Sequence, residues 1–257
     1  MSEAFDTRIR DAQGTGGLHV HYRLPESGQR APLVVMCHGF SVDGTESHRM
    51  FLEMAREYQA AGMAVVLFDQ HGCGYSDGDF EEFSFERSVA DLGAVVEWSR
   101  SELPVDPRRI IVHGQSLGTA IATVQVRDGM DVAGVVLWNL SADLYNRYLR
   151  MLGPEILDAG VTCIDKGLYV RRELLDELRK YDIVECFIGW SRPVLFINSG
   201  ADDLGVPALS ETAARHAGSL AERRVIPGAK HSFKCQRDLQ RQAMNTTVDW
   251  VRAIIHT

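Results

Sequence analysis

The chain has 257 residues, of which 45% are hydrophobic and 24% are charged, the composition of an ordinary globular protein. Its formal charge is −8, from 35 acidic and 27 basic side chains, so nucleic acid and anionic membrane surfaces are not expected as main partners. The length fits one domain over residues 1–257 better than two. The sequence shows no secretory leader, no membrane-spanning run and five scattered cysteines without a Cys-x-x-Cys pair, which together predict a cytoplasmic protein.

Short apolar runs alternate with longer amphipathic segments along the chain. The runs are rich in β-branched and aromatic residues, which is typical of strands buried on both faces of a parallel sheet. They occupy residues 33–37, 64–68, 110–113, 135–138 and 194–197. Helical spacing follows at residues 47–61, 84–100, 116–127 and 236–255, whereas residues 19–24 alternate with period two and predict an antiparallel edge strand. This order predicts an α/β protein with a mostly parallel, doubly wound sheet.

The alternation stops between Asn139 and Arg192, where no apolar strand is predicted. The segment is mixed in charge, has helical spacing and is too long for an ordinary loop. We therefore expect a small helical cap over residues 140–190, inserted after the strand that ends near Trp138.

A candidate nucleophile lies at the centre of Gly114-Gln115-Ser116-Leu117-Gly118. The Gly-x-Ser-x-Gly pattern follows a predicted strand and opens a predicted helix, which is the setting of a strained turn that exposes a serine above a sheet. The flanking glycines let neighbouring backbone pass close to the turn. A plain strand–helix turn is the alternative interpretation, but the position between a buried strand and a helix favours catalysis.

The run Cys37-His38-Gly39-Phe40, at the end of an earlier predicted strand, supplies a candidate oxyanion hole. Acyl transfer passes through a tetrahedral intermediate whose oxyanion is stabilised by backbone N–H groups. The expected donors are the N–H groups of Phe40 and Leu117. His38 is expected to hydrogen-bond this loop rather than to titrate in catalysis.

The acid and the base are expected on the last two loops. His231 follows the last short strand and precedes the final helix, where a base would meet Ser116. Asp203 is the preferred acid because Gly-x-x-Asp-x-x-Val-Pro places it three residues after a glycine, with Asp202 as the neighbouring alternative and Asp143 as a remote one. Nucleophile, acid and base then follow one another in the chain order of the α/β-hydrolase fold.

The remaining patterns are weaker. The Gly-rich run at residues 69–76 lacks the lysine of a phosphate loop and is expected to be a structural turn. His19 and His21 share one face of the predicted edge strand, but two histidines do not complete a metal site. We expect neither a metal nor a cofactor.

Several motifs resemble the feruloyl/cinnamoyl-esterase branch of the α/β-hydrolase superfamily. They are His38-Gly39-Phe40, Thr45-Glu46-Ser47-His48, Phe68-Asp69 before a Gly-x-Gly turn, Ser76-Asp77-Gly78-Asp79-Phe80-Glu81 and Val105-Asp106-Pro107-Arg108-Arg109-Ile110. The resemblance implies a Ser-His-Asp triad, an oxyanion hole at Phe40 and Leu117, a cap that shapes the acyl pocket, and a possible homodimer. The sequence departs from the family where Thr119 follows the motif, because a small residue is usual there, and throughout the cap.

The sequence therefore predicts a serine hydrolase acting on a small-molecule carboxylic ester through an acyl-enzyme. The candidate substrate-binding residues are His38, Gln115, Tyr145, Tyr148 and Trp190, although the cap aromatics would serve equally to pack the cap onto the sheet. A biosynthetic enzyme that hydrolyses, transfers or eliminates an acyl group such as acetate stays open, and so does a non-catalytic hydrolase-fold binding protein. Epoxide hydrolases and dehalogenases carry Asp where this chain has Ser116.

Overall fold

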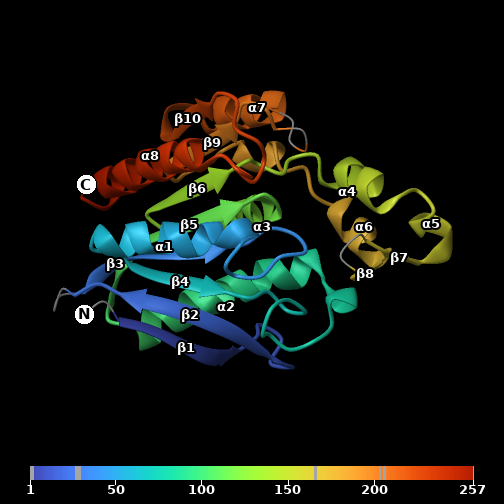
Figure 1. Ribbon diagram of the computed structural model, residues 1–257, viewed down its shortest axis with the longest axis horizontal. Helices are drawn as coiled ribbons and strands as arrows, with labels where there is room; N and C mark the ends of the chain where they lie inside the picture. Colours follow the sequence, from blue (N-terminus) through green and yellow to red (C-terminus); the bar gives the residue numbers. More distant parts are fainter. Residues whose placement is uncertain (1–2, 27–29, 165–166, 203, 205–206, 257) are drawn as a thin grey trace.

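A computed structural model describes residues 3–26, 30–164, 167–202, 204 and 207–256 of the chain. These residues build an eight-stranded sheet in the order β1-β2-β4-β3-β5-β6-β9-β10 (Figure 1). The two pairings that involve β2 are antiparallel and all the others are parallel. The strands are β1 (Glu3–Arg10), β2 (Gly17–Leu24), β3 (Ala31–Cys37), β4 (Ala64–Phe68), β5 (Val105–Gln115), β6 (Gly134–Trp138), β9 (Val194–Ser199) and β10 (Ala221–Ile226).

Helices cover both faces of the sheet, as a doubly wound topology requires. The helices are α1 (Met50–Ala60), α2 (Phe85–Glu102), α3 (Leu117–Arg127), α7 (Pro207–Ala217) and α8 (Arg237–Ile255). Buried side chains of α1 and α8 pack with one face of the strands, and those of α2, α3 and α7 pack with the other. Short 3₁₀ turns lie at Ser47–Arg49, Phe80–Glu82 and Gly218–Leu220.

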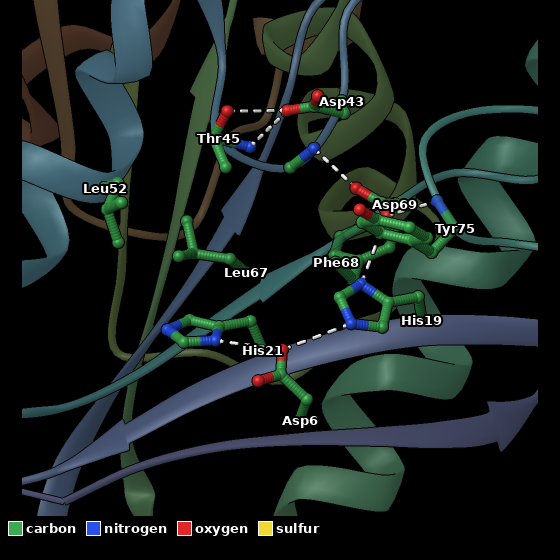
Figure 2. A pocket seen from close by; sticks show the side chains of 11 residues that line it. Asp6, His19, His21, Asp43, Thr45, Leu52, Leu67, Phe68, Asp69 and Tyr75 are labelled. Atoms are coloured by element: carbon green, nitrogen blue, oxygen red, sulfur yellow. Dashed lines mark hydrogen bonds and ion pairs between the residues drawn. The ribbon is translucent and has the colours of Figure 1, made fainter.

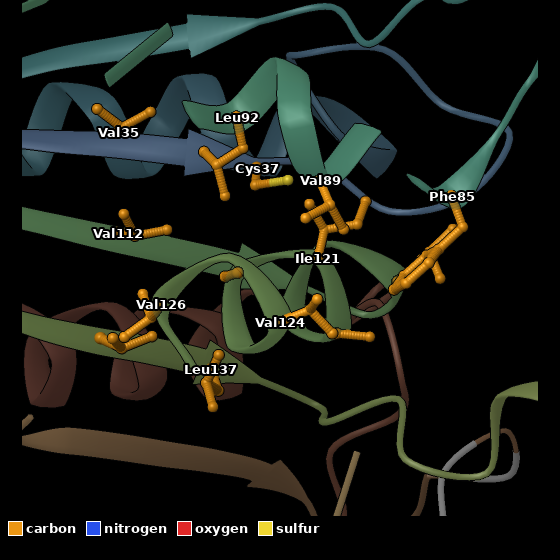
Figure 3. Close-up of a cluster of buried hydrophobic side chains, with 14 of the residues drawn as sticks. Val35, Cys37, Phe85, Val89, Leu92, Val112, Ile121, Val124, Val126 and Leu137 are labelled. Carbon is orange, nitrogen blue, oxygen red and sulfur yellow. The ribbon is translucent and has the colours of Figure 1, made fainter. Parts of the chain in front are cut away.

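The alternation of side chains along each strand divides the core into two layers. In β3, Val35 and Cys37 belong to the layer under α2 and α3, whereas Val34 and Met36 belong to the layer under α1 and α8. Figure 3 shows the first layer, in which Leu92 of α2 and Ile121 of α3 lie against the strands. The continuous apolar strand pattern therefore reflects burial on both faces, and it fixes the sheet on which the site is built.

The segment between β6 and β9 projects beyond the carboxyl ends of the parallel strands (Figure 1). It contains α4 (Leu144–Leu152), α5 (Ile156–Ala159), β7 (Val161–Cys163), β8 (Tyr169–Arg171), α6 (Glu173–Leu178) and a 3₁₀ turn at Glu185–Phe187. β7 and β8 form an antiparallel pair that the sequence did not predict, because each strand is short and largely exposed.

The predicted α/β-hydrolase sheet is confirmed, and the structure adds strand β1 to it. β1 occupies the sheet edge beyond β2, so the predicted edge position of residues 19–24 is wrong. The sequence did not predict β1, because most of its side chains are exposed and form no apolar pattern. α7 was also not predicted. Within the described residues, none of the helices combines the length and the apolar character needed to cross a bilayer.

Candidate active site

Ser116 lies at the junction of β5 and α3 in a strained backbone conformation, with φ 51° and ψ −119°. A side chain cannot be added at either flanking glycine without a clash. A Cβ atom on Gly114 would lie 2.4 Å from the Gly118 carbonyl oxygen, and one on Gly118 would lie 2.0 Å from the Cys37 carbonyl oxygen. The glycines thus permit the close backbone approach that the motif predicted, and the turn lifts Ser116 to the carboxyl end of the sheet.

Ser116, His231 and an aspartate form a continuous hydrogen-bonded chain. Nε2 of His231 lies 2.9 Å from Oγ of Ser116, and Nδ1 of the same ring lies 2.8 Å from Oδ2 of Asp202. Ser116 and His231 are each only 8% exposed. A carboxylate at Nδ1 fixes the tautomer in which Nε2 is free to accept the serine proton.

The carboxylate that contacts His231 is that of Asp202, which corrects the sequence-based preference for Asp203. Asp203 itself lies outside the described residues. The motif spacing could not distinguish two adjacent aspartates, since the direction of each side chain depends on the backbone after β9. The remote alternative, Asp143, precedes α4 and pairs with Arg150 at 3.4 Å instead.

The backbone of His231 is fixed by two amide side chains. Nδ2 of Asn139 donates to the His231 carbonyl oxygen at 2.6 Å, and Nε2 of Gln115 donates to the same oxygen at 3.2 Å. Oδ1 of Asn139 accepts from the N–H of Ser199 at 2.7 Å, so this side chain also joins the ends of β6 and β9. Asn139 was not singled out from the sequence, although its position directly after a buried strand was a usable signal.

The loop after β3 is held by two buried side chains. His38 is fully buried; Nδ1 lies 2.8 Å from the Gly39 carbonyl oxygen, and Nε2 accepts from the N–H of Gln70 at 3.0 Å. The expected role of His38 in bonding this loop is therefore confirmed. The Glu46 carboxylate accepts from the N–H of Gly39 at 2.7 Å, which leaves the next N–H, that of Phe40, as the candidate oxyanion donor.

A cavity of about 330 Å³ opens at Ser116 and His231. Of the candidate substrate-binding residues, Gln115 and the buried Tyr148 line it, together with Phe40. The Phe40 and Tyr148 rings lie 5.1 Å apart, edge to face, so the loop after β3 and helix α4 meet at this point. The cavity is therefore bounded by both the sheet loops and α4.

Three candidate substrate-binding residues lie outside the lining of this cavity. His38 is buried beneath the loop, as described above. Arg179 lies over the ring of Tyr145 at 4.3 Å and donates to its hydroxyl, which anchors that side chain within the cap. Trp190 packs 4.8 Å from Phe187 and donates to the Arg192 carbonyl oxygen at 2.6 Å. The two aromatic residues thus pack the cap, which was the open alternative.

Arg147 is a site residue that the sequence did not reveal. Nη2 of its guanidinium lies 3.2 Å from Ser116 Oγ and 3.5 Å from His231 Nε2. It occupies α4 one residue before Tyr148, and only the packing of α4 against the sheet loops brings it over Ser116.

A second cavity, of about 210 Å³, lies beside β2 (Figure 2). Figure 2 shows His19 between Asp69 and Asp6. Nδ1 of His19 lies 3.1 Å from Oδ2 of Asp69 and its Nε2 lies 3.2 Å from Oδ1 of Asp6, while Nδ1 of His21 lies 3.1 Å from the same Asp6 oxygen. Asp69 also accepts from the N–H groups of Gly44 at 2.7 Å and Tyr75 at 2.8 Å, so the Gly-rich run is a structural turn. In the described part of the chain, no group of three or more His, Cys, Asp or Glu side chains is arranged so that it could hold a metal ion.

Comparisons with known sequences show what this chain is similar to. The family model described as "Serine aminopeptidase, S33" matches residues 28–152. "Uncharacterized protein Rv2307c" of Mycobacterium tuberculosis is 31% identical over 206 residues, which are 80% of this chain. The chain spans 65% of the length of that relative.

Two fungal relatives match shorter stretches. "Polyketide transferase ATR5" of Stachybotrys chlorohalonatus is 30% identical over 107 residues, 41% of this chain and 35% of the relative. "Thiohydrolase apmlB" of Arthrinium phaeospermum is 28% identical over 107 residues, 41% of this chain and 34% of the relative.

Solved structures establish the fold. Est1E from Butyrivibrio proteoclasticus with bound ferulic acid superposes with a TM-score of 0.86 at 18% identity, covering 98% of this chain and 100% of that one. The α/β hydrolase GrgF from a Penicillium gives 0.83 at 15% identity, covering 99% and 100%. This chain therefore has the α/β-hydrolase fold and is similar in structure to Est1E, and the predicted resemblance to α/β-hydrolases is confirmed at the level of the fold.

Proposed function

We propose that this protein is a serine hydrolase that cleaves a carboxylic ester through an acyl-enzyme. The observation that carries the proposal is the hydrogen-bonded chain from Ser116 through His231 to Asp202, with separations of 2.9 and 2.8 Å. Each side chain comes from a different loop at the carboxyl end of the sheet. An arrangement that needs three separate loops to converge on a strained serine is typical of nucleophilic catalysis.

The geometry supports a specific order of events. Ser116 attacks the ester carbonyl while Nε2 of His231 takes the hydroxyl proton, and Asp202 stabilises the imidazolium through Nδ1. The N–H groups of Phe40 and Leu117 stabilise the tetrahedral oxyanion, helped by the amino-terminal end of α3. His231 then passes its proton to the leaving alcohol, and a water activated by the same ring releases the acid.

The test is covalent labelling with a fluorophosphonate, which reacts with an activated serine. The wild-type protein should be labelled at Ser116, and Ser116→Ala should abolish labelling. Ser101→Ala is the matched control, because Ser101 is an exposed serine at the end of α2. Labelling that persists undiminished in Ser116→Ala would disprove the nucleophile assignment.

A second candidate is acyl transfer or thioester hydrolysis with the same residues. It is favoured by the names of two relatives, a polyketide transferase and a thiohydrolase, each of which matches 41% of this chain. Elimination of an acyl group such as acetate uses the same oxyanion donors, with His231 as the base on substrate carbon. Comparison of an oxygen ester with its thioester, with and without an added alcohol acceptor, distinguishes these outcomes by the products formed.

A further inference from the structure

We infer that Arg147 determines specificity by binding a carboxylate on the acyl part of the substrate, close to the carbonyl that Ser116 attacks. The preferred substrates are then half-esters of short dicarboxylic acids. This inference rests on the proposed function, because it names the substrate class of that same site.

The position of the guanidinium carries the argument. Nη2 lies 3.2 Å from Ser116 Oγ and 3.5 Å from His231 Nε2, so a full positive charge is placed beside the reacting atoms. An arginine stays protonated at every relevant pH and presents planar donors that match a carboxylate. An anionic acyl chain gains a charge-assisted pair with such a group that a neutral acyl chain cannot form.

Arg147 is held in place from its other side. Nη1 donates to Ser141 Oγ at 3.2 Å, and Ser141 is fully buried. The N–H of Ser141 donates to Thr119 Oγ1 at 2.9 Å, and that hydroxyl donates to the Ser116 carbonyl oxygen at 2.5 Å. Thr119, the residue that departs from the family pattern, thus links the nucleophile turn to the arginine.

The other charges around the cavity favour an anion. Lys230 and Lys234 are exposed residues in its lining, and Glu46 is the acidic residue among its described lining residues. The Glu46 carboxylate is already engaged by the N–H groups of Gly39 at 2.7 Å and Ser47 at 2.9 Å. Within the described ranges, no carboxylate forms an ion pair with Arg147.

The distances also limit the length of the acyl chain. In a reactive complex the carbonyl carbon lies about 3 Å from Ser116 Oγ. A carboxylate oxygen lies about 2.8 Å from the guanidinium nitrogen that it accepts from. Because that nitrogen is itself 3.2 Å from Oγ, the carboxylate oxygen lies at most about 9 Å from the ester carbonyl carbon, which limits the acyl part to short dicarboxylic chains. Malonate and succinate half-esters meet this requirement.

The experiment compares monoethyl succinate with ethyl levulinate, a neutral analogue in which a methyl ketone replaces the carboxylic acid. For the wild-type protein, kcat/KM should be at least about tenfold higher for the succinate ester. In Arg147→Gln that ratio should fall to near one. Arg150→Gln is the matched control, since it removes an exposed arginine from the same helix and should keep the wild-type ratio.

A binding measurement gives a second readout that needs no turnover. Free succinate should slow fluorophosphonate labelling of the wild-type protein and of Arg150→Gln, but not labelling of Arg147→Gln. Equal reaction of wild-type protein with both esters, or a ratio that survives in Arg147→Gln, overturns the inference. An equal loss for both esters in Arg147→Gln also overturns it, because Arg147 would then act on the reacting carbonyl of any ester. A wild-type protein that is not labelled at Ser116 overturns the proposed function, whereas labelling without charge preference overturns only this inference.

Discussion

Oδ2 of Asp202 lies 2.8 Å from Nδ1 of His231, on the side of the ring opposite Ser116. The N–H of Leu204 donates to the other oxygen of this carboxylate at 2.9 Å, which orients the group toward the histidine. The carboxylate therefore has both a partner in the proposed reaction and a backbone contact that fixes its direction. This relationship makes the identity of the acid testable against its neighbour in sequence.

Asp202→Asn should lower kcat by about three to four orders of magnitude, because an amide at Nδ1 favours the wrong tautomer of His231. Asp203→Asn is the matched control and should retain kcat within a few-fold. Steady-state kinetics on any ester that the protein hydrolyses provides the measurement. A greater loss from Asp203→Asn than from Asp202→Asn would return the acid role to Asp203.

Asn139→Ala should destabilise the protein by about 2 kcal/mol or more. The change removes the partner of two buried backbone groups, the His231 carbonyl and the Ser199 N–H, and each unpaired group costs about 1–3 kcal/mol. Urea unfolding measures the loss, and kcat should fall as well because His231 is less well positioned. Asn146→Ala, at an exposed site on α4, should change stability by less than about 0.5 kcal/mol.

Gly118→Ala should be among the most damaging single substitutions in the chain. Its Cβ would lie 2.0 Å from the Cys37 carbonyl oxygen and 2.7 Å from the His38 carbonyl oxygen, so the turn at Ser116 must move away from β3. We expect a loss of soluble, folded protein or of fluorophosphonate labelling. Gly189→Ala has open space around it and a φ of +75°, and should cost only about 1–2 kcal/mol. Wild-type labelling of Gly118→Ala would contradict the required close approach.

Stability should fall on acidification because burial lowers the pKa of His113 to about 3. Between the ordinary histidine pKa near 6.5 and about 3, the unfolded chain binds a proton that the folded protein excludes. Unfolding is thus favoured as pH falls below about 6.5, by roughly 1.4 kcal/mol for each pH unit from this group. Urea unfolding from pH 7 to 5 should show a shallower pH dependence for His113→Gln than for wild-type protein. His256→Gln, at an exposed site after α8, should keep the wild-type slope.

The local sequence was sufficient for features that depend on neighbouring residues. Gly114-Gln115-Ser116-Leu117-Gly118 predicted the strained turn because glycine spacing and the strand before it are both local. The continuous apolar runs predicted the buried strands because burial on both faces excludes polar residues from them. β1 and the β7–β8 pair were missed because mostly exposed strands need no such pattern.

The sequence by itself determined the sheet, the position of the proposed nucleophile and the histidine proposed to serve it, since each is marked by residue types at fixed spacing. Only the tertiary structure decided that Asp202 faces His231 and that Arg147 lies over Ser116. The physical reason is that both contacts depend on side-chain direction across loops far apart in the chain. Arg147 and Ser116 are 31 residues apart in the chain. Helix α4, which carries Arg147, is placed by packing of Tyr148 against Phe40 rather than by any local motif.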